Sequence, residues 1–161
     1  MKKTLICLVF AMIAAITSTA WAQVEHEIAL TRAEIQTERQ AIVAENLPLT
    51  EEQAKAFWPL FRDYRQELAG IGDRYVKLIE DYAKNYATMT DEQAKKLLDE
   101  MLSVQKDELK IKSDWVSKFG KALPMTAVAR FYQIENKLDA IVRLELAAEI
   151  PLVEHKPAQG K

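Results

Sequence analysis

The residues best suited to bind a metal ion are two histidines that lie beside carboxylates. His26 stands between two glutamates, and His155 follows Glu154. Imidazole and carboxylate suit zinc, copper or nickel, and methionine thioethers suit cuprous ion. However, no His-x-x-x-His pair occurs, and the two histidines are far apart in the chain. Metal sensing or buffering therefore remains an alternative, and no metal site is predicted. The methionines that could contribute are Met89, Met101 and Met125.

Hydrolytic chemistry would need a hydroxyl next to a histidine, and the sequence does not offer that pair. Ser103, Ser113 and Ser117 fall inside a predicted helix, away from both histidines. The four glycines do not form a phosphate-binding loop. The formal net charge of −2 argues against a nucleic-acid binder that relies on bulk positive charge. The sequence thus predicts a protein that is not an enzyme, uses no cofactor and binds no nucleic acid.

The first 22 residues have the plan of a secretory signal peptide. Two lysines precede an apolar run, and Ala20-Trp21-Ala22 is a small-x-small cleavage site before Gln23. The apolar run is shorter than the ~20 residues that span a bilayer. Cleavage would also remove Cys7, the single cysteine, so no disulfide is expected. We expect an exported protein without a membrane anchor, made of one helical domain over residues 23–153 and a flexible tail over 154–161.

Apolar periodicity predicts an all-α fold of four helices, at about 27–46, 51–86, 91–119 and 125–149. The second would be about 54 Å long if straight, at ~1.5 Å per residue, which is too long for a compact bundle of this mass. Pro59 removes a backbone hydrogen bond inside it, and Gly70 and Gly72 weaken its middle, so these residues should set a bend. The expected architecture is a long, bent helical hairpin.

Each helix carries its own apolar pattern. The first has isoleucines at sevenfold spacing, and the second has an a/d seam with spacings 4, 3, 4, 3, 4, 3, 4. Gly120 is expected to cap the third helix. The seam of the second helix is Phe57, Phe61, Tyr64, Leu68, Ile71, Tyr75, Leu78 and Tyr82. The third helix has Ala94, Leu97, Leu98, Met101, Leu102, Val104, Leu109, Trp115, Val116 and Phe119 on one broad side. The fourth has Val128, Phe131, Ile134, Leu138, Ile141 and Val142.

One short pattern occurs at the start of both the second and the third helix. Residues 49–53 read Leu-Thr-Glu-Glu-Gln, and residues 89–93 read Met-Thr-Asp-Glu-Gln. A threonine followed three residues later by glutamine is a capping box, in which each side chain bonds the backbone N–H of the other residue. The two copies indicate two ordinary helix starts or a duplicated helical unit. The motif residues are Leu49, Thr50, Gln53, Met89, Thr90 and Gln93.

A signal peptide followed by two such motifs in a small, cysteine-poor helical chain resembles the Spy/CpxP-like (LTxxQ-motif) periplasmic family. Residues 49–53 match the motif fully, and the second copy has methionine in place of leucine. The resemblance covers roughly residues 45–145. It implies a periplasmic location and a bent helical hairpin that dimerises into a thin cradle. It also implies an ATP-independent chaperone, an envelope-stress regulator or a metal-responsive sensor.

A cradle one helix layer thick could not bury all the aromatic side chains, and exposed apolar patches mark binding surfaces. We therefore expect a homodimer that binds unfolded or partly folded proteins, or an envelope sensor protein, without ATP. The alternative for the aromatic residues is an ordinary core or dimer seam. The candidate client-binding residues are Phe57, Trp58, Phe61, Trp115 and Phe119.

Overall fold

The computed structural model describes residues 37–153, and this part of the chain is all-α. The described residues contain four α-helices, a short 3₁₀ turn and no strand, which confirms the predicted fold class. The predicted signal peptide, the tail, His26 and His155 lie outside the described residues. The elements are the helical segment 37–46, α2 (Glu51–Asn85), η1 (Tyr86–Thr88), α3 (Asp91–Gly120) and α4 (Met125–Glu149).

The chain divides into two units, with the boundary after Asn46. The described part of the first unit is the helical segment 37–46. Its last residue, Asn46, donates a hydrogen bond from Nδ2 to the backbone oxygen of Ile42 at 2.9 Å. The side chain of Asn46 thus folds back onto the last turn of this helix. The predicted helix over 27–46 is thus present from residue 37, and its earlier residues lie outside the described range.

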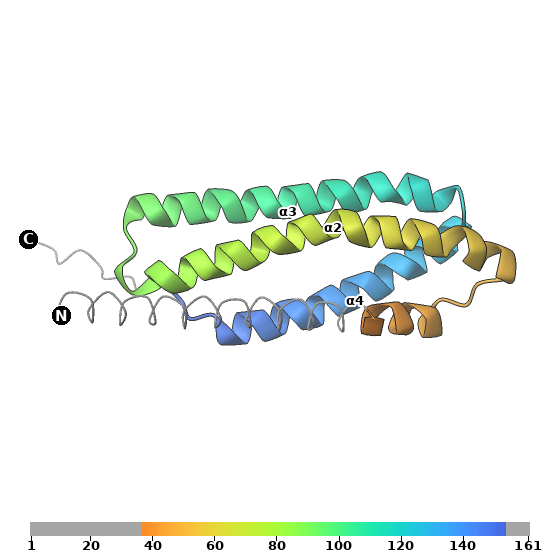
Figure 1. Cartoon of the computed structure of the whole chain (residues 1–161), viewed down its shortest axis with the longest axis horizontal. Helices are drawn as coiled ribbons and strands as arrows, with labels where there is room; N and C mark the ends of the chain where they lie inside the picture. Colours follow the sequence, from red (N-terminus) through yellow and green to blue (C-terminus); the bar gives the residue numbers. More distant parts are fainter. Residues whose placement is uncertain (1–36, 154–161) are drawn as a thin grey trace, which may run out of the picture. The chain divides into compact units, whose positions relative to one another are not determined.

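The second unit is built on a long helical hairpin. The chain runs along α2, turns through η1 and returns along α3, so that the two helices are antiparallel (Figure 1). A short connection then leads into α4, which runs back beside α2 in the same direction (Figure 1). As a result, the start of α2, the end of α3 and the start of α4 meet at one end of this unit.

Both predicted capping boxes are present. Thr50 Oγ1 accepts a hydrogen bond from the backbone N–H of Gln53 at 3.3 Å, and Gln53 Oε1 accepts one from the N–H of Thr50 at 3.0 Å. The same pair of bonds joins Thr90 and Gln93, at 3.2 and 2.9 Å. The apolar residues that precede the caps, Leu49 and Met89, are half-buried. The repeated motif therefore starts the two arms of the hairpin in the same way, which is a structural role.

The a/d seam of α2 forms the inner face of the hairpin, as predicted. Six of its eight residues are buried, and Tyr75 and Leu78 are half-buried. The predicted face of α3 is partly wrong, because Leu98, Leu102 and Leu109 are 52%, 58% and 68% exposed. They lie about a third to nearly half a turn around α3 from the buried Val104, given 3.6 residues per turn.

The glycine cap predicted for α3 does not form. Gly120 is the last residue of the helix, Lys121 is the C-cap, and no glycine in the described range has a positive φ. Gly120 matters for space instead, because a Cβ there would lie 3.1 Å from Met125 Sδ at the start of α4. The proline and the two glycines that were expected to set a bend do not interrupt α2. The helix runs through Pro59, Gly70 and Gly72 without a break.

Replacing both Gly70 and Gly72 by alanine should stabilise the protein. Both positions are exposed, and a Cβ at either would meet nothing within 4 Å. Alanine is favoured over glycine in a helix interior by up to about 1 kcal/mol per site. We expect the free energy of unfolding to rise by about 1–2 kcal/mol in urea titrations. As a control, the neighbouring substitution Ala69→Gly should lower the free energy of unfolding by up to about 1 kcal/mol. If the double-alanine variant were less stable than the unmodified protein, the glycines would have another role.

Candidate functional site

A cluster of aromatic rings fills the end of the second unit where α2, α3 and α4 meet. Phe57 and Phe61 come from α2, Phe119 comes from α3, and Phe131 comes from α4. The ring centroids of Phe119 and Phe131 are 4.9 Å apart, and those of Phe57 and Phe131 are 5.3 Å apart. Both pairs are edge-on, which is a favoured arrangement for aromatic rings. This aromatic cluster fixes α4 to the hairpin.

The burial of these rings contradicts the predicted client-binding surface. Phe57 and Phe119 are completely buried, Phe61 is 2% exposed and Trp115 is 4% exposed. A fully enclosed ring cannot contact another protein unless the cluster opens. Only Trp58 of the five candidates is half-buried and reaches the surface. Four of the five are therefore core residues, which is the alternative that the sequence had left open.

Trp115 is fixed by polar contacts as well as by packing. Its Nε1–H donates a hydrogen bond to Glu67 Oε2 at 2.6 Å. Lys118 Nζ lies 3.8 Å from the centroid of the indole ring, in a cation–π contact. The hydrogen bond joins α2 to α3 at the edge of the aromatic cluster, and the cation–π contact lies within α3.

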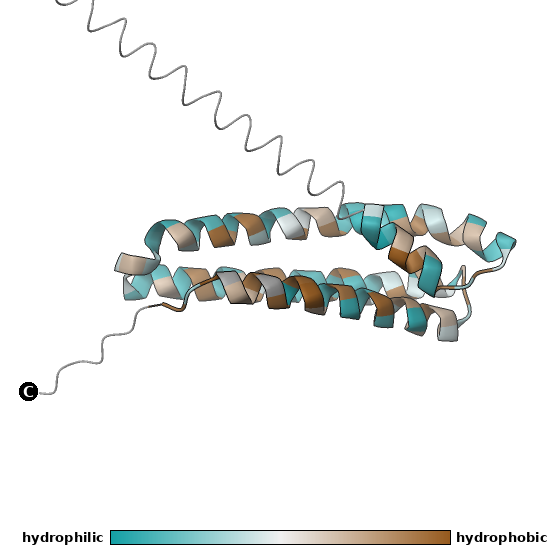
Figure 2. Cartoon of the chain, turned by 90° about the horizontal axis from the view of Figure 1, so that it is seen from below, coloured by the Kyte–Doolittle hydropathy of each residue, from teal (hydrophilic) through white to brown (hydrophobic). Residues whose placement is uncertain are grey.

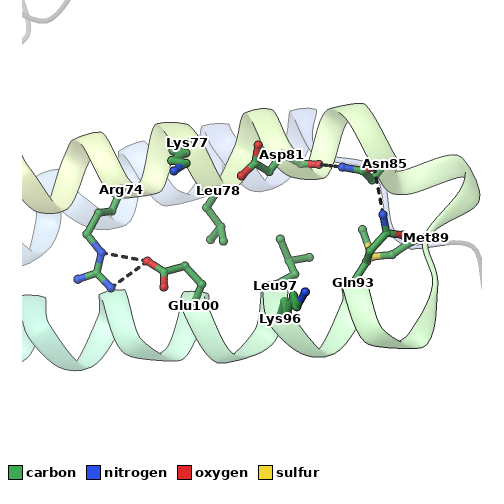
Figure 3. A pocket seen from close by; sticks show the side chains of 10 residues that line it. All are labelled: Arg74, Lys77, Leu78, Asp81, Asn85, Met89, Gln93, Lys96, Leu97 and Glu100. Carbon is green, nitrogen blue, oxygen red and sulfur yellow. Dashed lines mark hydrogen bonds and ion pairs between the residues drawn. The ribbon is translucent and has the colours of Figure 1, made fainter.

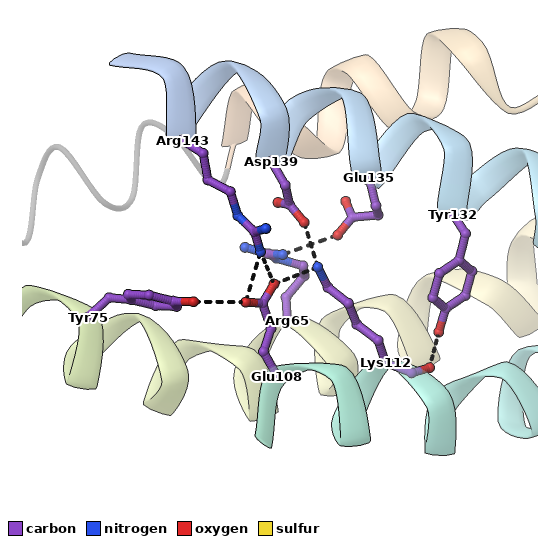
Figure 4. Close-up of polar contacts among 8 residues, drawn as sticks. All are labelled: Arg65, Tyr75, Glu108, Lys112, Tyr132, Glu135, Asp139 and Arg143. Atoms are coloured by element: carbon purple, nitrogen blue, oxygen red, sulfur yellow. Dashed lines mark hydrogen bonds and ion pairs between the residues drawn. The ribbon is translucent and has the colours of Figure 1, made fainter. Parts of the chain in front are cut away.

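Next to the aromatic cluster, a network of charged side chains joins α3 to α4 (Figure 4). Lys112 Nζ contacts Glu108 Oε1 at 2.6 Å and Asp139 Oδ2 at 2.7 Å. Arg143 Nη2 contacts Glu108 Oε2 at 3.0 Å. The side chains of Lys112, Glu108 and Asp139 are only 12–20% exposed. We call Glu108, Lys112, Asp139 and Arg143 the polar network.

A second buried carboxylate lies on α4, one turn before Asp139. Glu135 is 1% exposed and accepts a hydrogen bond from Arg65 Nη1 of α2 at 3.2 Å. On the same helix, the Tyr132 hydroxyl donates to the backbone oxygen of Lys112 at 2.6 Å. Thus α4 is held on the hairpin by polar contacts to both α2 and α3, in addition to the packing of its aromatic residues.

Burial and neighbouring charge change the titration of these groups. Burial, with the nearby Glu135 carboxylate, raises the pKa of Tyr132 to about 12. The same two causes raise the pKa of Tyr64 well above its ordinary value. Burial alone would lower the pKa of Lys112, but its hydrogen bonds to Asp139 and Glu108 outweigh burial and raise it.

We predict that the protein loses stability above about pH 10. The folded-state pKa of Tyr64, Tyr132 and Lys112 lies above the unfolded value of about 10–10.5 in each case. Above that pH the unfolded chain releases protons that the folded chain still holds, so rising pH favours unfolding. Urea midpoints should be constant from pH 8 to 9 and fall between pH 10 and 12. Tyr132→Phe should make the fall shallower, and a constant midpoint up to pH 11.5 would contradict the prediction.

Tyr64→Phe should stabilise the protein. The Tyr64 hydroxyl is buried and has no hydrogen-bond partner among the residues that the structure describes. An unpaired buried hydroxyl costs about 1–3 kcal/mol, and phenylalanine keeps the ring contacts of the aromatic cluster. We expect the free energy of unfolding at pH 7 to rise by about 1 kcal/mol in urea titrations. The matched variant Tyr132→Phe should lower it, because that hydroxyl is hydrogen-bonded.

The surface beside the polar network combines a groove with exposed leucines. A groove of about 510 Å³ lies between α3 and α4, lined by the polar network, Gln105, Leu109, Asn136 and Ala140. Leu98, Leu102 and Leu109 are spaced by four and seven residues, so they line up along one side of α3. On α4, Ile141 and Leu144 are 56% and 73% exposed. Figure 2 shows apolar residues, in brown, recurring along the α4 ribbon that leads into the tail marked C.

The described residues contain no group of three or more histidine, cysteine, aspartate or glutamate side chains that could hold a metal ion. Met89 and Met101 are half-buried and Met125 is exposed. His26 and His155, the two histidines that lie beside carboxylates in the sequence, lie outside the described residues. No helix within residues 37–153 combines the length and the apolar character that crossing a membrane requires.

The fold and this surface define an all-α protein built on a long helical hairpin with a third helix fastened against it. No protein-family model matches the chain, and no curated protein or solved structure has significant similarity to it.

Sequence reasoning missed the buried charges, although the spacing contains a signal for them. Glu135 lies seven residues after Val128, four after Phe131 and three before Leu138, so it occupies a seam position of α4. Similarly, Glu108 is four residues after the buried Val104 and seven before the buried Trp115. A charged residue in register with a seam is a candidate for a buried ion pair.

Proposed function

We propose that this is an exported, periplasmic, chaperone-like protein that binds unfolded or partly folded proteins without ATP. The observation that supports the proposal best is the row of exposed leucines on α3. Large apolar side chains exposed in a line beside a groove are typical of surfaces that bind other proteins. The two capping-box motifs, which resemble the LTxxQ motif, add support for this class of function.

In this proposal the binding surface consists of Leu98, Leu102 and Leu109, and the buried aromatic residues serve only as core. Charged side chains line the same groove as Leu109, namely Lys112 and Arg143 as cations and Glu108 and Asp139 as anions. A partly unfolded chain offers apolar side chains and charges of both signs. Weak contacts of this mixed kind would allow capture and release without nucleotide hydrolysis.

The test is aggregation of a heat-sensitive protein such as citrate synthase, followed by light scattering without ATP. We expect the purified protein in molar excess to reduce scattering. Replacing all three leucines by glutamine should remove at least half of that effect while the melting temperature changes little, since the side chains are exposed. The control is Leu152→Gln, because Leu152 is 91% exposed but follows α4. No reduction by the unmodified protein, or full activity of the triple variant, would refute the proposal.

We also propose a homodimer, which the heptad spacing of the helices favours. Light scattering coupled to size-exclusion chromatography should give twice the mass of one chain. If the triple leucine variant became monomeric, the leucine row would belong to the dimer interface, and that result would count against its role in client binding. Binding to the outer domain of an envelope sensor, with no effect on aggregation, would support a regulatory protein instead.

A further inference from the structure

A second cavity, of about 510 Å³, lies between α2 and α3 near the turn that joins them (Figure 3). Its apolar lining comes from Leu78 of α2, Leu97 of α3 and Met89 in the connection between the helices. All three side chains are half-buried. Figure 3 shows Leu78 and Leu97 pointing toward one another across the gap between the helices. The volume lies within the usual range for small-molecule sites, roughly 300–1,000 Å³.

Polar bridges between the two helices cross both ends of this cavity. At one end, Arg74 Nε donates to Glu100 Oε1 at 3.0 Å. At the other, Gln93 Nε2 donates to Asn85 Oδ1 at 3.4 Å. Arg74 and Asn85 are eleven positions apart on α2, a distance of about 16 Å at ~1.5 Å per residue. The cavity is therefore an elongated slot with a side-chain hydrogen bond across each end.

The seam of α2 leaves this slot unfilled because its two nearest tyrosines contact other groups. The Tyr75 hydroxyl donates to Glu108 Oε2 at 3.4 Å, and the Tyr82 hydroxyl donates to the backbone oxygen of Pro151, beyond α4. Between them on the seam stands Leu78, which lines the slot. A hairpin that closed fully would need larger side chains at this level of α2 and α3.

Lysines from both helices border the slot. Lys77 and Lys96 are exposed, and both line the cavity. Two carboxylates that also line the cavity already have cationic partners. Glu100 Oε1 pairs with Arg74 Nη2 at 2.9 Å, and Asp81 Oδ1 pairs with Lys84 Nζ at 3.9 Å. Lys96 contacts Glu92 at 3.3 Å, whereas Lys77 has no ion pair among the residues that the structure describes. The border thus offers cationic groups above a floor of apolar side chains.

We infer that this slot binds a single-chain amphiphile with a carboxylate head, namely a free fatty acid of medium chain length. The acyl chain lies along Leu78, Leu97 and Met89, and the carboxylate is bound by Lys77 and Lys96. An elongated cavity with an apolar strip and a side-chain hydrogen bond across each end fits a linear chain better than a helix or a loop of protein, which would have to break these hydrogen bonds. This site is separate from the leucine row and does not depend on the proposed function.

The test is calorimetric titration of the purified protein with dodecanoate below its micelle-forming concentration. We expect saturable binding of one molecule per chain. Leu97→Asn should weaken the affinity at least tenfold, because it places an amide in the apolar floor. The double variant Lys77→Gln, Lys96→Gln should weaken dodecanoate binding about fivefold while leaving binding of the uncharged dodecanol unchanged.

The matched control is Leu98→Asn, the next residue on α3, which is more exposed and does not line the slot. Its affinity for dodecanoate should equal that of the unmodified protein. Equal weakening by Leu98→Asn, several bound molecules per chain, or no binding would overturn the inference. Leu97-dependent binding to intact phosphatidylglycerol vesicles would overturn the assignment to a free acid. Should Leu97→Asn fail to fold by circular dichroism, the lysine double variant, whose changed side chains are exposed, decides the question.

Discussion

Replacing Phe119 by alanine is expected to lower the free energy of unfolding by about 4 kcal/mol. The ring is completely buried at the end of α3. Its centroid lies 5.5 Å from those of Phe57, Tyr64 and Trp115 and 4.9 Å from that of Phe131. Alanine would leave a cavity among side chains from all three helices, which cannot all move inward together. The contacts that hold the start of α4 on the hairpin would weaken at the same time.

Urea denaturation followed by circular dichroism measures this loss. The control is Leu109→Ala, which removes a large apolar side chain from the same helix at a position that is 68% exposed. That variant should change the free energy of unfolding by less than about 1 kcal/mol. If the two variants were equally stable, the aromatic cluster would not be the core of this unit.

The position of the aromatic cluster could have been predicted from the chain order. Four aromatic residues of α2, from Phe57 to Tyr64, lie in its first half, whereas Tyr75 and Tyr82 lie further along it. The large aromatic residues of α3 lie near its end and those of α4 near its start. An antiparallel hairpin followed by a returning helix places these three segments at one end. The number of aromatic residues suggested a surface too large to bury, but topology gathers Phe57, Phe119 and Phe131 in one place. Composition carries no information about such gathering.

The helices themselves were predictable because local signals agree with one another. The threonine caps begin α2 and α3 at the predicted residues, and the seam of α2 keeps its period through Pro59. The face of α3 was less predictable, because Leu98 and Leu102 extend the apolar pattern beyond the part that α2 and α4 cover. Periodicity identifies every apolar side of a helix, and only the packing of its neighbours decides which side is buried.

The polar network offers the sharpest test of how α4 is held. Glu108→Ala is expected to lower the free energy of unfolding by about 3 kcal/mol, since it leaves Lys112 mostly buried with one partner instead of two. It also removes the acceptor for Arg143 and for the Tyr75 hydroxyl. Glu108→Gln should cost less, because the amide oxygen still accepts a hydrogen bond.

The matched control for this prediction is Asp99→Ala, also on α3. Asp99 pairs with Lys95 four residues away, as Glu108 pairs with Lys112, but both partners are 64–74% exposed. Exposed pairs of this kind contribute about 0.3–0.5 kcal/mol, so the variant should be close to the unmodified protein in urea titrations. Equal effects of the two substitutions would mean that the solvent screens Glu108 as fully as Asp99. In that case α4 would be held on the hairpin by the aromatic cluster and by the contacts of Tyr132 and Glu135, without a contribution from Glu108.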